Sequence, residues 1–167
     1  MTREMGDAMH RAIRTARALV GCALLLGAAA SQALVAQLAE IPGLGAADVE
    51  TLADAGIETP QQLLERAARH TQRLELAKQS GIGAPQISRW IHFVDLTRVP
   101  GLGVAQATLL DASGVNTARE LAKRNPEKLL QRVARVNVER RLLPETPSLT
   151  ELEAWIRAAR ELPRIIE

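Results

Sequence analysis

The sequence is poor in aromatic residues and in the residue types that favour strands. Its 167 residues include no tyrosine, one phenylalanine and two tryptophans. Runs of valine, isoleucine and threonine, which are typical of strands, are also missing. Alanine, leucine, arginine and glutamate dominate instead, and all four form helices well. We therefore predict an all-α protein, and an apolar content of 47% is sufficient for a packed core.

Cysteine is nearly absent as well, because Cys22 is the only one in the chain. The chain therefore forms no internal disulfide, and nothing after Cys22 can serve as a thiol nucleophile or a thiolate ligand. The sequence has no Gly-Lys-Ser/Thr phosphate loop and no calcium-loop spacing. His92 and Asp95 stand three residues apart, but two candidate ligands without a third nearby make a weak metal site. We expect a partly buried His92 in a protein that is not an enzyme, with no cofactor and no metal.

The first 33 residues have the layout of a secretory signal peptide. Three arginines between residues 11 and 17 precede an apolar run of thirteen residues at 18–30, and the letters SQA at 31–33 place small residues where a signal peptidase reads. The run is shorter than the roughly 20 residues that a spanning helix needs. We expect cleavage after Ala33 and a mature protein that is periplasmic or secreted, with no transmembrane segment left in it.

Other interpretations of this segment stay open. Residues 18–36 could act as an uncleaved membrane anchor, or the segment could be the amphipathic or disordered start of a cytoplasmic protein. The letters LVGC at 19–22 resemble a lipoprotein box, but Arg17 leaves almost no apolar run before it.

One segment of the chain occurs twice. Residues 41–64 align with residues 99–122 at a constant offset of 58 residues and without gaps. Both copies read apolar-Pro-Gly-Leu-Gly, then a short predicted helix, and then Gly, a β-branched residue, any residue and Thr. The identical pairs are Pro42/Pro100, Gly43/Gly101, Leu44/Leu102, Gly45/Gly103, Ala47/Ala105, Leu52/Leu110, Gly56/Gly114, Thr59/Thr117 and Leu63/Leu121.

Each part of this repeat has a local structural reason. The Gly-Leu-Gly stretches at 43–45 and 101–103 permit a very short link between two helices, because glycine adopts a positive φ at little cost. The leucine between the glycines is expected to hold the link against the core. Gly56 and Gly114 stand where a helix should end on a left-handed residue.

The residues that follow predict helix starts. Thr59 with Gln62, and Thr117 with Glu120, have the spacing of two capping boxes. Pro60 fits the first helical position. Further starts are predicted at Asn125 and at Ser148 with Glu151.

The later part of each copy is less regular. Residues 80–91 hold another Gly-apolar-Gly hairpin, with Gly81 and Gly83 as structural glycines. Its counterpart near 143–156 lacks the glycines and lies seven residues further along. Trp90 and Trp155 still correspond and are expected to be core anchors. We predict about eight short helices in two similar halves, 34–97 and 98–167, with no sheet.

These residues resemble the helix-hairpin-helix class. The stretches IPGLG…LADAGIETPQQLL and VPGLG…LLDASGVNTARELAKRNPEKL, with Trp90-Ile91 and LEAWIRAAREL, are also similar to one uncharacterised bacterial family, domain of unknown function 4332. The resemblance covers about residues 37–162. It implies paired hairpins in compact all-α units, and it implies no activity.

In the helix-hairpin-helix class, backbone N–H groups of the glycine turn can bind a DNA phosphate. The first copy does not suit this role. Residues 34–65 contain six acidic residues and no basic one, so a phosphate would be repelled. We expect Gly43, Leu44 and Gly45 to be structural only.

The second copy is more permissive, because no acid follows Gly103 within the next three residues. Residues 119–141 contain eight basic residues against three acidic ones. On a helix that begins at 126, Leu129, Leu130, Val133 and Val136 would face inward, and Lys128, Arg132 and Arg135 would share the outer face. The candidate anion-binding or nucleic-acid-binding residues are Gly101, Leu102, Gly103, Arg119, Lys123 and Arg124. An ordinary solvated face explains the same charges, since no aromatic residues are interleaved for base stacking.

The sequence thus favours an exported helical module that binds a protein or another anionic partner. The alternative is a weak, sequence-independent DNA-binding protein. Export and DNA binding conflict, because a cleaved signal would take the mature protein away from the chromosome.

Overall fold

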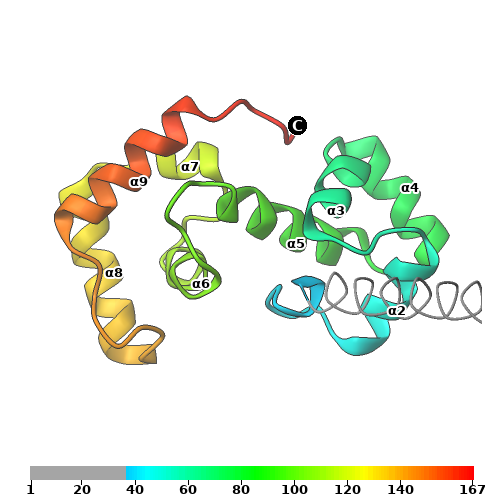
Figure 1. Cartoon of the computed structure of the whole chain (residues 1–167), viewed down its shortest axis with the longest axis horizontal. Coiled ribbons are helices and arrows are strands. Elements are labelled where there is room, and N and C mark those ends of the chain that lie inside the picture. The colour runs from blue at the N-terminus through cyan, green and yellow to red at the C-terminus, as the bar shows by residue number, and fades with distance from the viewer. Residues whose placement is uncertain (1–36) are drawn as a thin grey trace, which may run out of the picture.

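The computed structural model describes residues 37–167, and every regular element in this range is a helix (Figure 1). The all-α prediction is confirmed. The expected signal peptide at 1–33 lies outside the described residues. Between residues 37 and 167, no helix is long and apolar enough to cross a membrane. The helices are α2 (Ala46–Asp54), α3 (Pro60–Ala67), α4 (His70–Ser80), α5 (Ala84–Thr97), α6 (Val104–Ala112), α7 (Ala118–Ala122), α8 (Pro126–Arg140) and α9 (Leu149–Glu161).

Helix α5 occupies the centre of the molecule (Figure 1). It packs on α3 and α4, and it also contacts α6 and α7. At the other end, α9 packs on α7 and α8. The pair α3 and α4 is therefore covered by α5 in the same way that α7 and α8 are covered by α9.

One hydrophobic core runs through both parts of the molecule. Leu52 on α2 and Leu110 on α6 are almost completely buried, at 0% and 1% exposure. Trp90 on α5 and Trp155 on α9 are buried too, as expected for core anchors. This cluster gives the described part of the chain a continuous apolar core.

Helices α2 and α6 end in the same way, on glycines with a positive φ. Gly56 has φ +76° and Gly114 has φ +78°. The next amide in each case donates to a carbonyl five residues back: Ile57 to Leu52 at 2.8 Å and Val115 to Leu110 at 2.9 Å. This is the Schellman pattern, in which the left-handed residue lets the chain reverse and satisfies carbonyls of the last turn. The predicted helix ends are confirmed.

The predicted helix starts are confirmed with one correction. Thr59 and Gln62 form a complete capping box, and so do Ser148 and Glu151. At α7 the Thr117 side chain accepts from the Glu120 amide, but the Glu120 carboxylate accepts from the Asn116 amide at 2.9 Å. The second predicted capping box is therefore wrong in its return bond, because the Glu120 side chain bonds the amide one residue before the cap.

The Gly-Leu-Gly links are short turns that begin on a left-handed glycine, Gly43 at φ +77° and Gly101 at φ +85°. In both turns the leucine is buried, and its amide donates to the apolar residue three positions earlier, at 3.1 Å for Leu44 and 3.0 Å for Leu102. The link at 81–83 joins α4 to α5 through another such glycine, Gly81.

Helices α3 and α7 end without a left-handed residue, and at each end an arginine from another helix bonds a terminal carbonyl. Arg73 on α4 is buried, and its Nη1 donates to the carbonyl of Ala67, the last residue of α3, at 3.0 Å and to that of Ala68, its C-cap, at 2.7 Å. Arg160 on α9 donates from Nε to the Ala122 carbonyl of α7 at 3.1 Å. These contacts place positive charge at the negative end of each helix dipole.

After α9, residues 162–167 form an extended stretch that we call the C-terminal segment. It runs back across the molecule towards α3 and α4 (Figure 1). Arg98 donates from Nη2 to the Pro163 carbonyl at 3.3 Å, and Arg73 donates from Nη2 to the Glu167 carbonyl at 2.7 Å. The Glu167 amide donates to the Ala68 carbonyl at 3.2 Å. The segment thus ties α9 to α5 and to the corner between α3 and α4.

Candidate functional site

The first glycine hairpin has an acid of its own at the start of α2. The Asp48 carboxylate lies 3.8 Å from the position that a Cβ on Gly45 would occupy, and it accepts a hydrogen bond from Gln86 Nε2 at 3.2 Å. A phosphate approaching the amides of α2 would meet this carboxylate. The geometry agrees with a structural role for Gly43, Leu44 and Gly45.

The second hairpin differs at the corresponding position, where Gln106 replaces Asp48. The Gln106 side chain folds over Gly103, with Oε1 at 2.8 Å from the position of a Cβ there. The first turn of α6 carries no acid. Gly101 lies against Trp155 of α9, whose Nε1 would be 3.3 Å from a Cβ on that glycine. The second hairpin is therefore uncharged and is packed against α9.

The structure brings together only some of the candidate anion-binding residues. Arg119 and Lys123 line a cleft beside His92 and Asp95 of α5. Leu102 and Gly103 line a separate groove beside Val94 and Thr97 of α5. Residues 92 and 95 point away from residues 94 and 97, because successive helix positions are turned by about 100°. The second hairpin and the two basic residues of α7 therefore lie on different sides of α5.

Arg124 has a role within the fold. Its Nη2 donates to the Gly114 carbonyl at 2.5 Å, and its Nε is buried. The Arg132 guanidinium also lies near this glycine, with Nη2 at 3.6 Å from the position of a Cβ. Both cations thus lie at the C-terminal end of α6, where the helix dipole is negative. Arg124 is held at this helix end and does not join Arg119 and Lys123 in the cleft.

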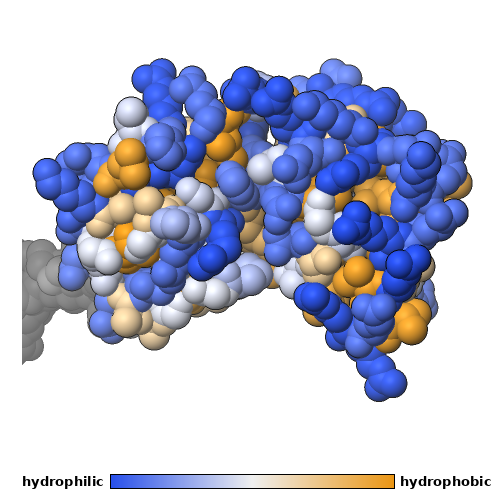
Figure 2. All heavy atoms as spheres, turned by 180° about the vertical axis from the view of Figure 1, so that it is seen from behind, coloured by the Kyte–Doolittle hydropathy of each residue, from blue (hydrophilic) through white to orange (hydrophobic). Residues whose placement is uncertain are grey.

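Helix α8 presents a row of exposed basic side chains, Lys128, Arg132 and Arg135, which we call the α8 basic face. Leu129 and Val133 on the opposite side of the helix are buried. This arrangement matches the helical periodicity expected from the sequence. None of the three cations forms an ion pair with the described residues. The ion pair found in this part of the chain joins Arg98 and Asp95. Hydrophilic side chains cover most of the rear surface of the molecule, and apolar atoms show in separate patches (Figure 2).

A cleft of about 700 Å³ opens between α5, α7, α9 and the C-terminal segment. We call it the central cleft. Its basic side chains are Arg119 from α7, Lys123 from the C-cap of α7, Arg160 from α9 and Arg164 from the C-terminal segment. Its acidic side chains are Asp95, Glu120 and Glu167. The cleft is the place where side chains from four parts of the chain meet around an open space.

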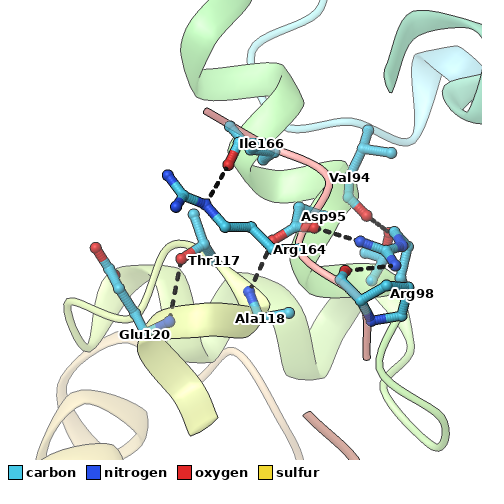
Figure 3. A network of polar contacts seen from close by, with 10 residues as sticks. Val94, Asp95, Arg98, Thr117, Ala118, Glu120, Arg164 and Ile166 are labelled. Atoms are coloured by element: carbon cyan, nitrogen blue, oxygen red, sulfur yellow. Dashed lines mark hydrogen bonds and ion pairs between the residues drawn. The ribbon is translucent and has the colours of Figure 1, made fainter. Parts of the chain in front are cut away.

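Asp95 lines this cleft and is part of a polar network that also includes Arg98 and Ala118 (Figure 3). Its carboxylate is buried and accepts from the Ala118 amide at 3.0 Å and from Arg98 Nη1 at 2.6 Å. Arg98 in turn reaches the Pro163 carbonyl. Asp95 therefore satisfies the first amide of α7 and, through Arg98, holds the C-terminal segment.

His92 also lines the cleft and is half-buried, as expected. Burial lowers its pKa, and the positive charge of Arg73 adds to this effect, while Glu120, Asp95 and Asp111 oppose it. Both Asp95 oxygens accept a hydrogen bond, one from Arg98 and one from the Ala118 amide. Within residues 37–167, no group of three or more His, Cys, Asp or Glu side chains could hold a metal ion.

Sequence reasoning missed Arg160, Arg164 and the function of Asp95. Asp95 and Ala118 are 23 positions apart, and no local pattern connects an acid on one helix with the first amide of another. Arg160 and Arg164 follow the basic stretch 119–141 and were not part of it. Only the docking of α9 on α7 brings them to the cleft.

A family model described as Domain of unknown function (DUF4332) matches residues 42–162. The chain belongs to this family. The DUF4332 region begins inside the first glycine hairpin and takes in all helices from α2 to α9, but it stops at the start of the C-terminal segment. Arg164 thus lies just beyond it. No match was found among curated proteins or among solved structures.

Proposed function

We propose that this protein is a non-enzymatic helical binding module that is exported from the cytoplasm and holds a protein partner. The observation that supports this best is the α8 basic face. Lys128, Arg132 and Arg135 are exposed on one side of α8, with the Arg132 guanidinium beside Gly114, and no carboxylate in the described part of the chain pairs with them. A surface of this kind suits a partner with an acidic patch, because complementary charge speeds encounter and fixes orientation.

Export is part of the proposal because the basic, apolar and small-residue parts of residues 1–33 follow one another in the order of a signal peptide. The test is to fuse residues 1–40 to a reporter that is active only outside the cytoplasm. An active reporter and a mature chain that starts at Leu34 support export. A silent reporter with an unprocessed N-terminus contradicts it.

Partner binding is tested by affinity capture from an envelope extract, with the wild type and the triple variant Lys128→Glu, Arg132→Glu and Arg135→Glu. The matched control reverses three exposed arginines elsewhere: Arg66, Arg89 and Arg157. The proposal expects a protein that the wild type and the control retain and the α8 variant loses. A capture pattern that is the same for all three proteins contradicts it.

A second candidate function is weak, sequence-independent DNA binding through the second hairpin. It is favoured by the first turn of α6, which has Gln106 where α2 has Asp48 and carries no acid. It is weakened by the separation of the hairpin from Arg119 and Lys123 and by the engagement of Arg124. Fluorescence anisotropy of residues 34–167 with duplex DNA tests it, with Gly103→Asp as the variant that should abolish salt-sensitive binding. Absence of binding at low salt rejects this function.

A further inference from the structure

We propose that the central cleft is a binding site for a phosphate monoester. The site is separate from the α8 basic face, so it can hold or fail independently of the protein partner proposed above. The observation behind this proposal is that four basic side chains line a cleft of about 700 Å³.

The four cations reach the cleft from three different elements. Arg119 and Lys123 come from α7, Arg160 from the last turn of α9 and Arg164 from the C-terminal segment. None of them forms an ion pair within residues 37–167. A tetrahedral dianion can accept hydrogen bonds from several directions at once, and guanidinium and ammonium groups are its usual partners in proteins.

Two of the arginines are oriented in advance by the backbone. Arg160 donates from Nε to the Ala122 carbonyl at 3.1 Å, and Arg164 donates from Nε to the Ile166 carbonyl at 3.0 Å (Figure 3 shows the second bond). No hydrogen bond from their terminal Nη atoms to the described residues is present. Each guanidinium is thus fixed by one edge, and its two outer nitrogens are free to bind a phosphate oxygen pair. Because these side chains are already partly ordered, they lose less conformational entropy when a ligand binds.

The acids of the cleft offset only part of this charge. Both oxygens of Asp95 are engaged, by Ala118 and by Arg98. One oxygen of Glu120 accepts from the Asn116 amide. Arg98 balances the charge of Asp95, whereas Glu120 stays charged because the Asn116 amide is neutral. Two carboxylates, Glu120 and Glu167, therefore stand against four cations in the cleft.

The size of the cleft points to an organic phosphate. A volume of about 700 Å³ is far larger than a phosphate group and falls in the usual range for small-molecule sites. Ala159, Leu162 and Ile165 form an apolar part of the wall. An uncharged organic group attached to the phosphate would rest against these side chains.

The experiment is isothermal titration calorimetry at low ionic strength with residues 34–167, which contain the whole described core. A cooperative thermal transition first shows that each protein is folded. The soluble probe is glycerol 3-phosphate, with glycerol as the uncharged control. The same phosphate chemistry on a lipid is tested by co-sedimentation with phosphatidylcholine vesicles that contain phosphatidic acid.

The main variant is Arg119→Gln with Lys123→Gln, because neither side chain makes a hydrogen bond that supports the described fold. Arg164→Gln is a second variant, and it leaves α7 unchanged. The control is Arg89→Gln with Arg157→Gln, two exposed arginines that do not line the cleft and give the same change in charge. We expect the cleft variants to weaken binding by about tenfold or more, and the control to bind like the wild type.

The possible outcomes separate cleanly. Saturable binding of glycerol 3-phosphate that the cleft variants lose supports the site with a soluble ligand. Sedimentation with phosphatidic acid vesicles that depends on the same residues supports it with a lipid headgroup. No saturable binding of either probe overturns the proposal, and so does an equal loss in the control variant. Neither negative result bears on partner capture by the α8 basic face.

Discussion

The carboxylate of Asp95 on α5 caps the first amide of α7, where its Oδ2 accepts from the Ala118 N–H at 3.0 Å. The second oxygen binds Arg98 at 2.6 Å. One buried acid therefore fixes the start of a helix that follows 23 residues later in the chain. Since α7 carries Arg119 and Lys123, the position of these cations in the central cleft depends on this contact.

We predict that Asp95→Asn lowers the free energy of unfolding by about 2–3 kcal/mol, because it removes a charged acceptor from a buried, hydrogen-bonded pair and leaves Arg98 without its partner. Urea denaturation followed by circular dichroism measures this. Asp54→Asn, at an exposed acid that ends α2, serves as the control and should change stability by less than about 0.5 kcal/mol. Equal midpoints for the two variants would show that the Asp95 contact contributes little.

The two glycine hairpins offer a matched comparison. Gly43→Ala and Gly101→Ala each place a side chain at a positive φ, which costs about 1 kcal/mol. A Cβ at position 43 meets open space, whereas one at position 101 lies 3.3 Å from Trp155 Nε1. We expect Gly101→Ala to lose about 1 kcal/mol more than Gly43→Ala and to shift the Trp155 fluorescence. Identical losses would mean that Trp155 moves aside freely.

Helix α8 ends on a left-handed residue that is not glycine. Arg141 has φ 52° and ψ 44°, and its amide donates to the Asn137 carbonyl at 2.8 Å. We predict that Arg141→Gly raises the free energy of unfolding by about 0.5–1 kcal/mol, because glycine adopts this conformation without strain. The neighbouring change Arg140→Gly, at the last residue of the helix, should lower it, because glycine has a lower helix propensity than arginine. Thermal unfolding of both variants measures the pair, and a loss at both positions would contradict the prediction.

His92 predicts a pH dependence of stability. Burial lowers the pKa of the folded His92 below its ordinary value of 6.5. The unfolded chain then binds a proton that the folded chain does not, so stability falls as pH drops from about 6.5 towards the lowered folded pKa. His92→Gln should remove this loss, whereas His70→Gln, at an exposed histidine, should retain it. Urea midpoints between pH 5 and pH 7.5 are the measurement. A wild-type midpoint that is constant over this interval would contradict the assignment.

The sequence predicts the ends of helices well, because those signals are local. The glycines at 56 and 114 and the boxes at Thr59 and Ser148 act on residues within one turn, and all four are found. The error at Glu120 is also local, since the side chain reaches one residue further back than a capping box requires.

The central cleft was beyond such reasoning. It depends on the docking of α9 on α7 and on the path of the C-terminal segment, where Pro163 predicts only that a helix stops. Contacts such as Arg98 to Pro163 and Arg73 to Glu167 join residues that are 65 and 94 positions apart. Packing decides such contacts, and one sequence does not contain a local signal for them.

The arginines that bond the ends of α3 and α7 change how these two helices can come apart. A helix that ends on its own glycine can fray alone, whereas the last turn of α3 is bonded to Arg73 of α4 and the last turn of α7 to Arg160 of α9. Opening either end must therefore break a bond to a neighbouring helix. We therefore expect α3 and α7 to unfold together with the helices packed on them, as one cooperative unit. The amide hydrogens of their last turns should then exchange with solvent as slowly as those of the neighbouring helices.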